Sequence, residues 1–210
     1  MTVKDLSVRL PKRLKKYDKK GEEHYNLISA LHKSVRGSDP DAALYWLARI
    51  LDGGEDPRYI ARRILRMALE DVGLADPQAQ SICLHAWESF ERLGSPEGEL
   101  ALAQAVLYLA LAPKSNASYK GFANSLELVK KTGSEPPPKH ILNAPTDLMK
   151  DQGYGVGYEY DHDSEDGFSG QNYFPENIDR IPAYQPVERG FERELKKRIS
   201  YFNNLRKKRT

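Results

Sequence analysis

The sequence predicts an all-α protein, and three observations lead to this fold class. A capping residue followed by proline recurs at near-equal intervals, at Asp39-Pro40, Asp56-Pro57, Asp76-Pro77 and Ser95-Pro96. A side-chain acceptor at the N-cap and proline in the first turn are typical of helix starts. Apolar residues between these pairs recur with helical spacing. Patterns typical of strands and hairpin turns are nearly absent.

The first part of the chain is expected to form a helical bundle. Helices are predicted over residues 22–36, 40–52, 57–72, 77–93 and 96–111, with Gly53, Gly73, Gly94 and Pro113 closing the last four. The two middle proline-started helices are amphipathic, whereas 40–52 and 96–111 are apolar around nearly their whole circumference. A helix without a polar face must be covered on every side. We therefore expect these two helices to be the central members of the bundle.

The second part of the chain changes in character after a further helix near 115–131. That helix carries Tyr119, Phe122, Leu126 and Val129 at helical spacing. An extended polyproline-like segment at 135–138, a short helix at 145–152, an irregular stretch rich in glycine and aromatic residues, and a terminal helix at 187–206 are predicted to follow. Disordered segments are poor in aromatic residues, so we expect the irregular stretch to wrap over the helical body.

Charge is distributed unevenly along the 210 residues. The net charge is +2, but residues 1–20 carry +6 and residues 193–210 carry +7, which leaves −11 for the middle. Basic ends that also contain aromatic rings are candidates for sequence-tolerant contact with nucleic acid. The candidate DNA-binding residues are Lys12, Arg13, Lys15, Lys16, Arg206, Lys207, Lys208 and Arg209. The alternative is that both ends are solvated tails.

The single cysteine, Cys83, excludes an internal disulfide and suits a reducing compartment. No apolar run reaches the roughly 18 residues that a membrane span needs. The basic N-terminus also lacks the apolar core of a signal peptide. We therefore expect a cytoplasmic protein without a membrane partner.

Motifs of known catalytic centres are missing. The sequence has no phosphate-binding loop, no His-Glu-x-x-His, no paired Cys-x-x-Cys and no nucleophile elbow. The glycines at 153, 155 and 157 lack the strand and helix of a dinucleotide site. The acidic run 159–166 is interpreted as a surface turn in preference to a cation site.

Two further features leave alternatives open. His32 is expected to be a hydrogen-bonded interior histidine rather than a functional one. Four arginines between residues 58 and 66 form a basic helix face. That face could contact phosphates, or it could pair with acids of the same chain.

Long runs of the sequence resemble one protein family. They are Tyr17 to Arg49, Gly54 to Arg63, Glu70 to Pro77, Ala112 to Asn116 and Gly153 to Asp163. These runs are similar to the region after the ATPase core in the replication-associated recombination protein A family, also called the MgsA family. Members are AAA+ ATPases related to clamp loaders, which act at stalled replication forks and in recombination-linked repair.

The resemblance implies a domain organisation and a set of partners. Residues 1–20 would be a basic segment left from the AAA+ lid, 21–113 a collar-like oligomerisation bundle, and 114–210 a C-terminal helical region. The implied partners are three further copies of the chain and the upstream AAA+ domain, with DNA and single-strand-binding protein left open. ATP and Mg²⁺ sites belong to the family's upstream domain, so no residue here inherits a catalytic, cofactor or metal role.

The leading hypothesis is thus an interaction module without catalysis of its own. Its candidate core or interface residues are Tyr45, Trp46, Leu102, Val106 and Leu107. The second hypothesis is a module that binds single-stranded or forked DNA through its basic ends. The third is an independent enzyme that uses a metal in the acidic, histidine-containing run.

Overall fold

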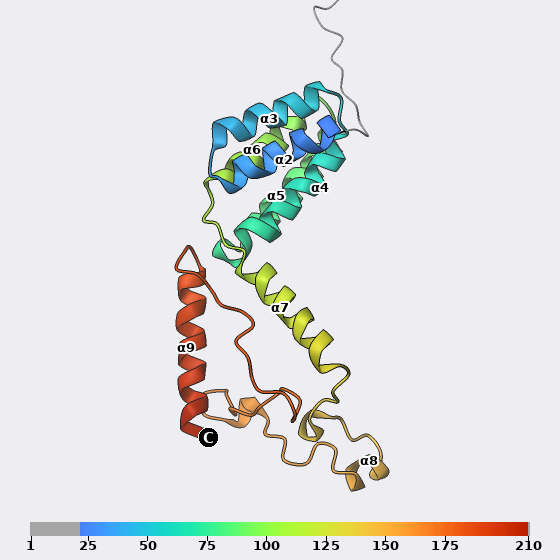
Figure 1. Ribbon diagram of the computed structural model, residues 1–210, viewed down its shortest axis with the longest axis vertical. Coiled ribbons are helices and arrows are strands. Elements are labelled where there is room, and N and C mark those ends of the chain that lie inside the picture. The colour runs from blue at the N-terminus through green and yellow to red at the C-terminus, as the bar shows by residue number, and fades with distance from the viewer. Residues whose placement is uncertain (1–21, 210) are drawn as a thin grey trace, which may run out of the picture. The chain divides into compact units, whose positions relative to one another are not determined.

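The computed structural model describes residues 22–209 and contains eight α-helices and no strand over that range (Figure 1). This confirms the predicted all-α class. The chain divides into two compact units, with the boundary between Lys114 and Ser115. No helix in the described range is long and apolar enough to cross a bilayer.

The described part of the first unit contains five α-helices and two short helical turns. These are α2 (Glu22–Arg36), α3 (Pro40–Asp52), α4 (Pro57–Met67), the π-helical turn η1 (Ala68–Val72), the 3-10 turn η2 (Gly73–Ala75), α5 (Ala79–Leu93) and α6 (Glu99–Leu111). The predicted bounds of α2 and α3 agree with the structure. The predicted helix 57–72 is correct in extent but changes from α to π geometry at Ala68.

Two of the four expected capping residues act as predicted. Asp39 accepts a hydrogen bond from the Ala42 N–H and Asp56 from the Arg58 N–H. Asp76 accepts one from the Gln78 N–H, but this bond lies in a turn, because α5 begins only at Ala79. The fourth prediction is wrong, because α6 begins at Glu99 and residues 95–98 form a turn. Gly94 ends α5 with a φ of +70°, a conformation that glycine adopts without steric cost.

Helix α6 is the centre of the first unit, since it contacts α2, α3, α4 and α5. It buries Leu102, Ala105, Val106, Leu109 and Ala110. The expectation that α3 is also enclosed is wrong. Helix α3 packs mainly on α2 and α6, and it buries only Ala43, Leu47 and Ile50. Because two neighbours cannot cover a whole helix, Tyr45 on its outer face stays 55 % exposed.

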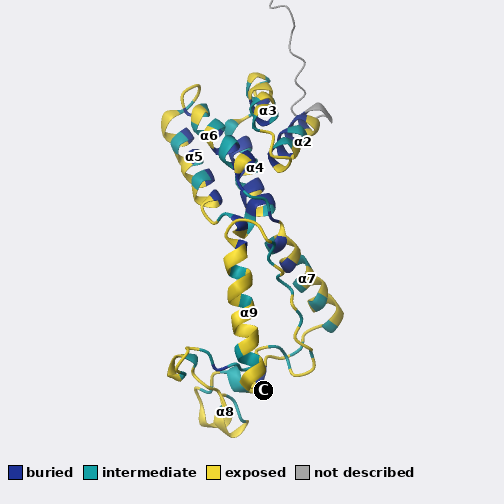
Figure 2. Cartoon of the chain, turned by 90° about the vertical axis from the view of Figure 1, so that its left-hand side faces the viewer, coloured by how far each residue is buried: buried dark blue, intermediate teal, exposed yellow. Residues whose placement is uncertain are grey.

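The second unit is built from two long helices and the irregular segments between them. Its elements are α7 (Ala117–Thr132), η3 (Lys139–Ile141), α8 (Asp147–Asp151), η4 (Asp161–Asp163) and α9 (Glu192–Arg209). Pro138 has the extended backbone predicted for the proline run, with φ −55° and ψ 141°. The predicted terminal helix starts too early, because α9 begins only at Glu192. Much of α9 is exposed within the chain (Figure 2).

A buried carboxylate connects the segments of the second unit. Glu192 is fully buried and accepts hydrogen bonds from the Ser115 hydroxyl at 2.8 Å, the Val187 N–H at 2.8 Å and the Tyr184 hydroxyl at 3.1 Å. Burial, together with the neighbouring charge of Glu192, raises the pKa of Tyr184. Glu192 therefore fixes the start of α9 beside the segment that precedes α7.

The aromatic stretch is anchored by fewer rings than expected. Phe168 packs against Phe202 of α9, with ring centroids 5.2 Å apart. Tyr158, Tyr160 and Tyr173 remain exposed. The prediction of rings as anchors therefore holds for part of the stretch and is wrong for these three tyrosines.

Two leucines of α6 test the position of the core. Leu102 is 1 % exposed and Leu100 is 66 % exposed. We expect Leu102→Ala to lower the free energy of unfolding by about 3 kcal/mol, because it removes buried apolar contacts and leaves a cavity. Leu100→Ala should change it by less than about 0.5 kcal/mol. Urea unfolding followed by circular dichroism measures both, and equal losses would contradict this assignment of the core.

Candidate functional site

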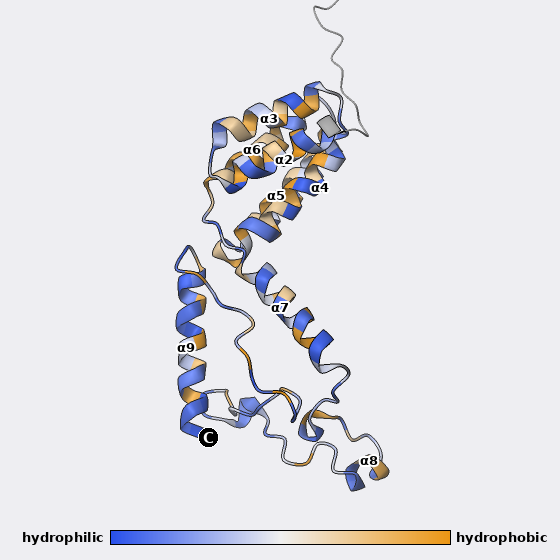
Figure 3. Cartoon of the chain, in the orientation of Figure 1, coloured by the Kyte–Doolittle hydropathy of each residue, from blue (hydrophilic) through white to orange (hydrophobic). Residues whose placement is uncertain are grey.

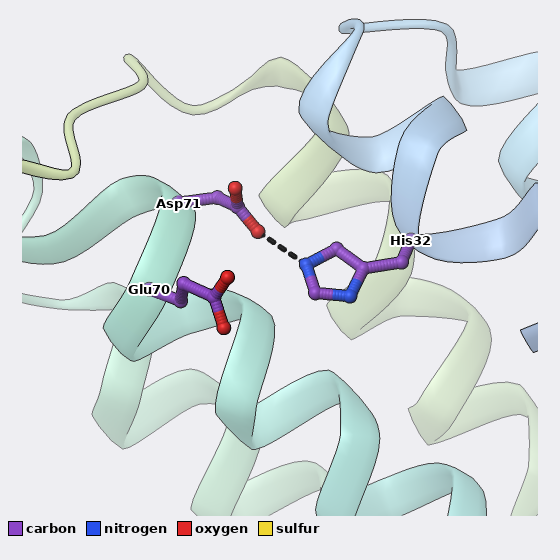
Figure 4. Close-up of side chains that lie close together, drawn as sticks. All are labelled: His32, Glu70 and Asp71. Atoms are coloured by element: carbon purple, nitrogen blue, oxygen red, sulfur yellow. Dashed lines mark hydrogen bonds and ion pairs between the residues drawn. The ribbon is translucent and has the colours of Figure 1, made fainter. Parts of the chain in front are cut away.

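The π-helical turn after α4 places two acids against α2. In η1 the helix widens at Ala68–Val72, and this turn carries Glu70 and Asp71. Asp71 is 6 % exposed, and its carboxylate lies close to His32 of α2 (Figure 4). π-helical turns inside helices occur frequently at functional sites. We therefore treat this part of the first unit as the starting point of the candidate site.

Asp71 is held by two side chains of α2. Its Oδ2 lies 2.5 Å from His32 Nε2, and its Oδ1 accepts a hydrogen bond of 2.5 Å from Arg36 Nε. Burial disfavours the charged carboxylate, but the hydrogen bonds from His32 and Arg36 outweigh it and lower the pKa of Asp71. His32 is itself buried. The prediction of a hydrogen-bonded interior histidine is confirmed.

Glu70 extends the network towards the surface. It accepts a hydrogen bond of 2.9 Å from Arg66 Nε and lies 3.5 Å from Arg36 Nη2. His32, Glu70 and Asp71 each place one potential metal-ligand atom within 4.8 Å of the others. A divalent cation at this point would have to displace Arg36 and Arg66 from the carboxylates. The chemistry of the donor set thus fits an internal ion-pair network better than a metal centre.

A groove of about 480 Å³ lies over this network. Residues of α2, α4 and η1 line it: Tyr25, Ile28, Ser29, His32, Lys33, Arg36, Tyr59, Arg63, Arg66 and Glu70. Four of these side chains are cationic and one is an acid at the surface. We call this feature the α2–α4 groove.

The arginines of α4 divide between the two roles that the sequence left open. Arg58 pairs with Glu91 of α5 through two hydrogen bonds, and Arg66 pairs with Glu70. Arg62 instead lies over the Tyr59 ring at 5.0 Å, and Arg63 lines the α2–α4 groove. Two arginines of the basic face therefore pair with acids of the same chain, and the other two have no such pair among the described residues.

The candidate DNA-binding residues at the two ends differ in what the structure says of them. Lys12, Arg13, Lys15 and Lys16 lie outside the described residues. At the other end, Arg206 and Arg209 lie over the Phe168 ring, and Arg209 also pairs with Asp166 at 2.7 Å. Lys207 and Lys208 are exposed. Intramolecular contacts thus engage two of the four C-terminal cations.

The candidate core or interface residues also separate into groups. Leu102 and Val106 are buried in the core, Trp46 and Leu107 are half-buried, and Tyr45 is exposed. Cys83 is buried too, and this burial raises the pKa of its thiol to about 12. Leu102, Val106 and Cys83 therefore have structural roles in the bundle.

The acidic run 159–166 is held by its own hydrogen bonds. Asp161 accepts bonds from the backbone N–H and hydroxyl of Ser169 and from the Tyr173 hydroxyl. These bonds lower the pKa of Asp161. No group of three metal-ligand side chains from this run converges in the part of the chain that the structure describes.

Sequence reasoning did not single out α7 as a candidate surface. Its residues Tyr119, Phe122, Leu126 and Val129 follow one another at spacings of three and four, so they share one helix face. All four are exposed, between 46 and 68 %. We call them the α7 stripe. The helical spacing was visible in the sequence, but the exposure of that face was not.

Asp71 gives a test of the buried network. The pKa of Asp71 is lower in the folded chain than in the unfolded chain, so its ionised carboxylate stabilises the fold. This stabilisation is complete above about pH 4 and disappears as the pH falls through the folded-state pKa. We expect Asp71→Asn to lower the free energy of unfolding by about 2 kcal/mol at pH 7. Wild type and variant should converge in acid. Urea unfolding across pH 2–7 measures the difference.

Glu88 is the matched control for Asp71. It pairs with Arg92 on the exposed face of α5, where solvent screens the interaction. Glu88→Gln should therefore have no measurable effect at any pH in the series. A constant Asp71→Asn deficit down to pH 2 would show that charge on Asp71 is not what stabilises the fold.

Comparison with known proteins identifies the chain's relatives. Residues 37–203 match the family model described as MgsA AAA+ ATPase C terminal, and residues 1–36 match one described as AAA C-terminal domain. The chain is 56 % identical to replication-associated recombination protein A of Coxiella burnetii over 91 % of its own length and 44 % of that protein.

Other relatives agree with this assignment. Identity to replication-associated recombination protein A of Escherichia coli K12 is 50 %, over 89 % of this chain and 42 % of that protein. Identity to ATPase WRNIP1 of Dictyostelium discoideum is 47 %, over 77 % of this chain and 19 % of that protein. The chain spans less than half the length of these curated relatives. It belongs to the family of MgsA AAA+ ATPase C-terminal regions, the same family as the replication-associated recombination proteins A.

Proposed function

We propose that this chain is a cytoplasmic self-association module of a AAA+ ATPase that acts in replication-associated recombination. In this proposal the module joins four copies of the protein and has no catalysis of its own. ATP hydrolysis would belong to the part of the longer relatives that this chain does not span. DNA and single-strand-binding protein would then be partners of the assembled particle.

The observation that carries the proposal is the α7 stripe. Figure 3 shows apolar segments along α7, alternating with hydrophilic ones. The opposite side of the same helix is already used, because Gly121 lies against the backbone of Ala183 and Tyr184. The exposed polar positions Lys120, Asn124 and Glu127 form a third side. The stripe is thus an apolar face that the rest of its unit leaves uncovered.

An exposed apolar face of this kind favours association. Burial of apolar surface contributes roughly 25 cal/mol per Å², and contiguous exposed patches mark interaction sites. Two identical stripes can cover each other around a two-fold axis, which is the commonest contact in homo-oligomers. This contact joins two copies, and a second contact between such pairs would complete the proposed four. The assembly with further copies that the family resemblance implies supports a second copy as the occupant.

The mass of the particle tests this proposal. We expect light scattering at micromolar concentration to give about 95 kDa, four copies of the 23.8-kDa chain. A charge on the stripe would have to be buried in the contact, so Phe122→Glu should lower the mass to that of smaller species.

Asn124→Glu is the matched control. It adds the same charge to the same helix, but on the exposed polar side. It should leave the mass unchanged. The proposal is wrong if wild type is monomeric, or if Phe122→Glu keeps the wild-type mass while circular dichroism shows both variants folded.

A further inference from the structure

The α2–α4 groove carries more positive charge than its own acids neutralise. Lys33, Arg36, Arg63 and Arg66 line it, against Glu70 at the surface and Asp71 beneath. Arg36 donates a hydrogen bond from its Nε to Asp71, and Arg66 donates one from its Nε to Glu70. Lys33 and Arg63 have no ion pair with an acid in the described chain. The groove therefore presents two uncompensated cations.

Arg63 gives the sharpest indication that the groove has a ligand. Its Nε is buried and has no hydrogen-bond partner among the described residues. A buried donor of a charged group is costly when it stays unpaired, and such groups in native proteins call for an explanation. An anionic oxygen in the groove would satisfy it once the Arg63 side chain turns its Nε towards the groove. A guanidinium is also well matched to phosphate oxygens.

Two aromatic rings border these cations. Tyr25 lines the groove and is 66 % exposed, which leaves its ring available to a ligand. Tyr59 is half-buried and held in place by Arg62 over its ring and by His24, whose ring centroid is 5.1 Å away. The Tyr59 ring is thus fixed, and the Tyr25 ring is open to solvent.

We propose that the α2–α4 groove binds a single strand of nucleic acid. Lys33, Arg63 and the outer nitrogens of Arg66 contact the phosphates, and Tyr25 stacks on a base. Cations that follow the backbone together with exposed rings are the combination by which proteins hold single strands without reading their sequence. An acidic peptide would use the cations but would gain little from the ring.

This site is distinct from the basic chain ends, and it does not depend on self-association. All its lining residues come from positions 25–70 of one chain. A monomeric chain would carry the same groove, so failure of the self-association proposal leaves this one standing. The reverse also holds.

Fluorescence anisotropy with a labelled oligothymidylate of about 20 nucleotides tests the site on the full chain. We expect Lys33→Gln/Arg63→Gln to weaken binding on the order of tenfold at about 50 mM salt. Loss of two phosphate contacts should also reduce the slope of log K against log salt by about 1.4. The control is Lys130→Gln/Lys131→Gln, which removes the same charge from exposed positions of α7 and should change binding little.

Tyr25→Ala separates stacking from phosphate contact. Removal of the ring should weaken binding about fivefold and leave the salt slope unchanged, because no charge is lost. Lys33→Gln alone is the second variant, since Lys33 is exposed and its loss cannot disturb the core. It should reduce the slope by about 0.7.

Two results would overturn the proposal. One is that the double and the single groove variants both bind the oligothymidylate as tightly as wild type does. The other is that binding of a labelled polyglutamate peptide requires Lys33 and Arg63, while binding of the oligothymidylate does not. That result would assign the groove to an acidic protein partner.

Discussion

Burial of a carboxylate is costly unless hydrogen bonds replace its water, and this constraint organises both units of the chain. Asp71 accepts from His32 and Arg36, which joins the end of α4 to α2. Glu192 accepts from Ser115 and from the segment before α9, which closes the second unit. In each unit, segments far apart in sequence must meet for one acid to be satisfied. The α2–α4 groove lies over the first of these networks.

Much of the fold was predictable because its signals are local. A capping acid followed by proline determines a helix start within a few residues, and Asp39 and Asp56 act in that way. The central position of α3 was predicted wrongly, because apolar composition does not show how many neighbours a helix has. The start of α9 was also missed, since Val187 and its neighbours are held by a hydrogen bond to Glu192 instead of continuing the helix.

The candidate surfaces were less predictable, because they depend on contacts between separate elements. The sequence drew attention to His32 and to the arginines of α4, but the partner Asp71 lies 39 residues from His32. No local pattern predicts that a π-helical turn aims this acid at α2. The α7 stripe was visible as a helical repeat, yet its exposure follows from packing on the opposite side of the helix, at Gly121. Spacing identifies a face, and only the fold shows what covers it.

In our proposal another copy of the chain covers the α7 stripe. Hydroxyl-radical footprinting at low and at high protein concentration measures the accessibility of Phe122 directly, with Tyr25 of the first unit as an exposed internal reference. Oxidation of Phe122 should fall as the concentration rises, while oxidation of Tyr25 should stay constant. Equal oxidation of Phe122 at all concentrations, in a chain whose mass shows association, would contradict it.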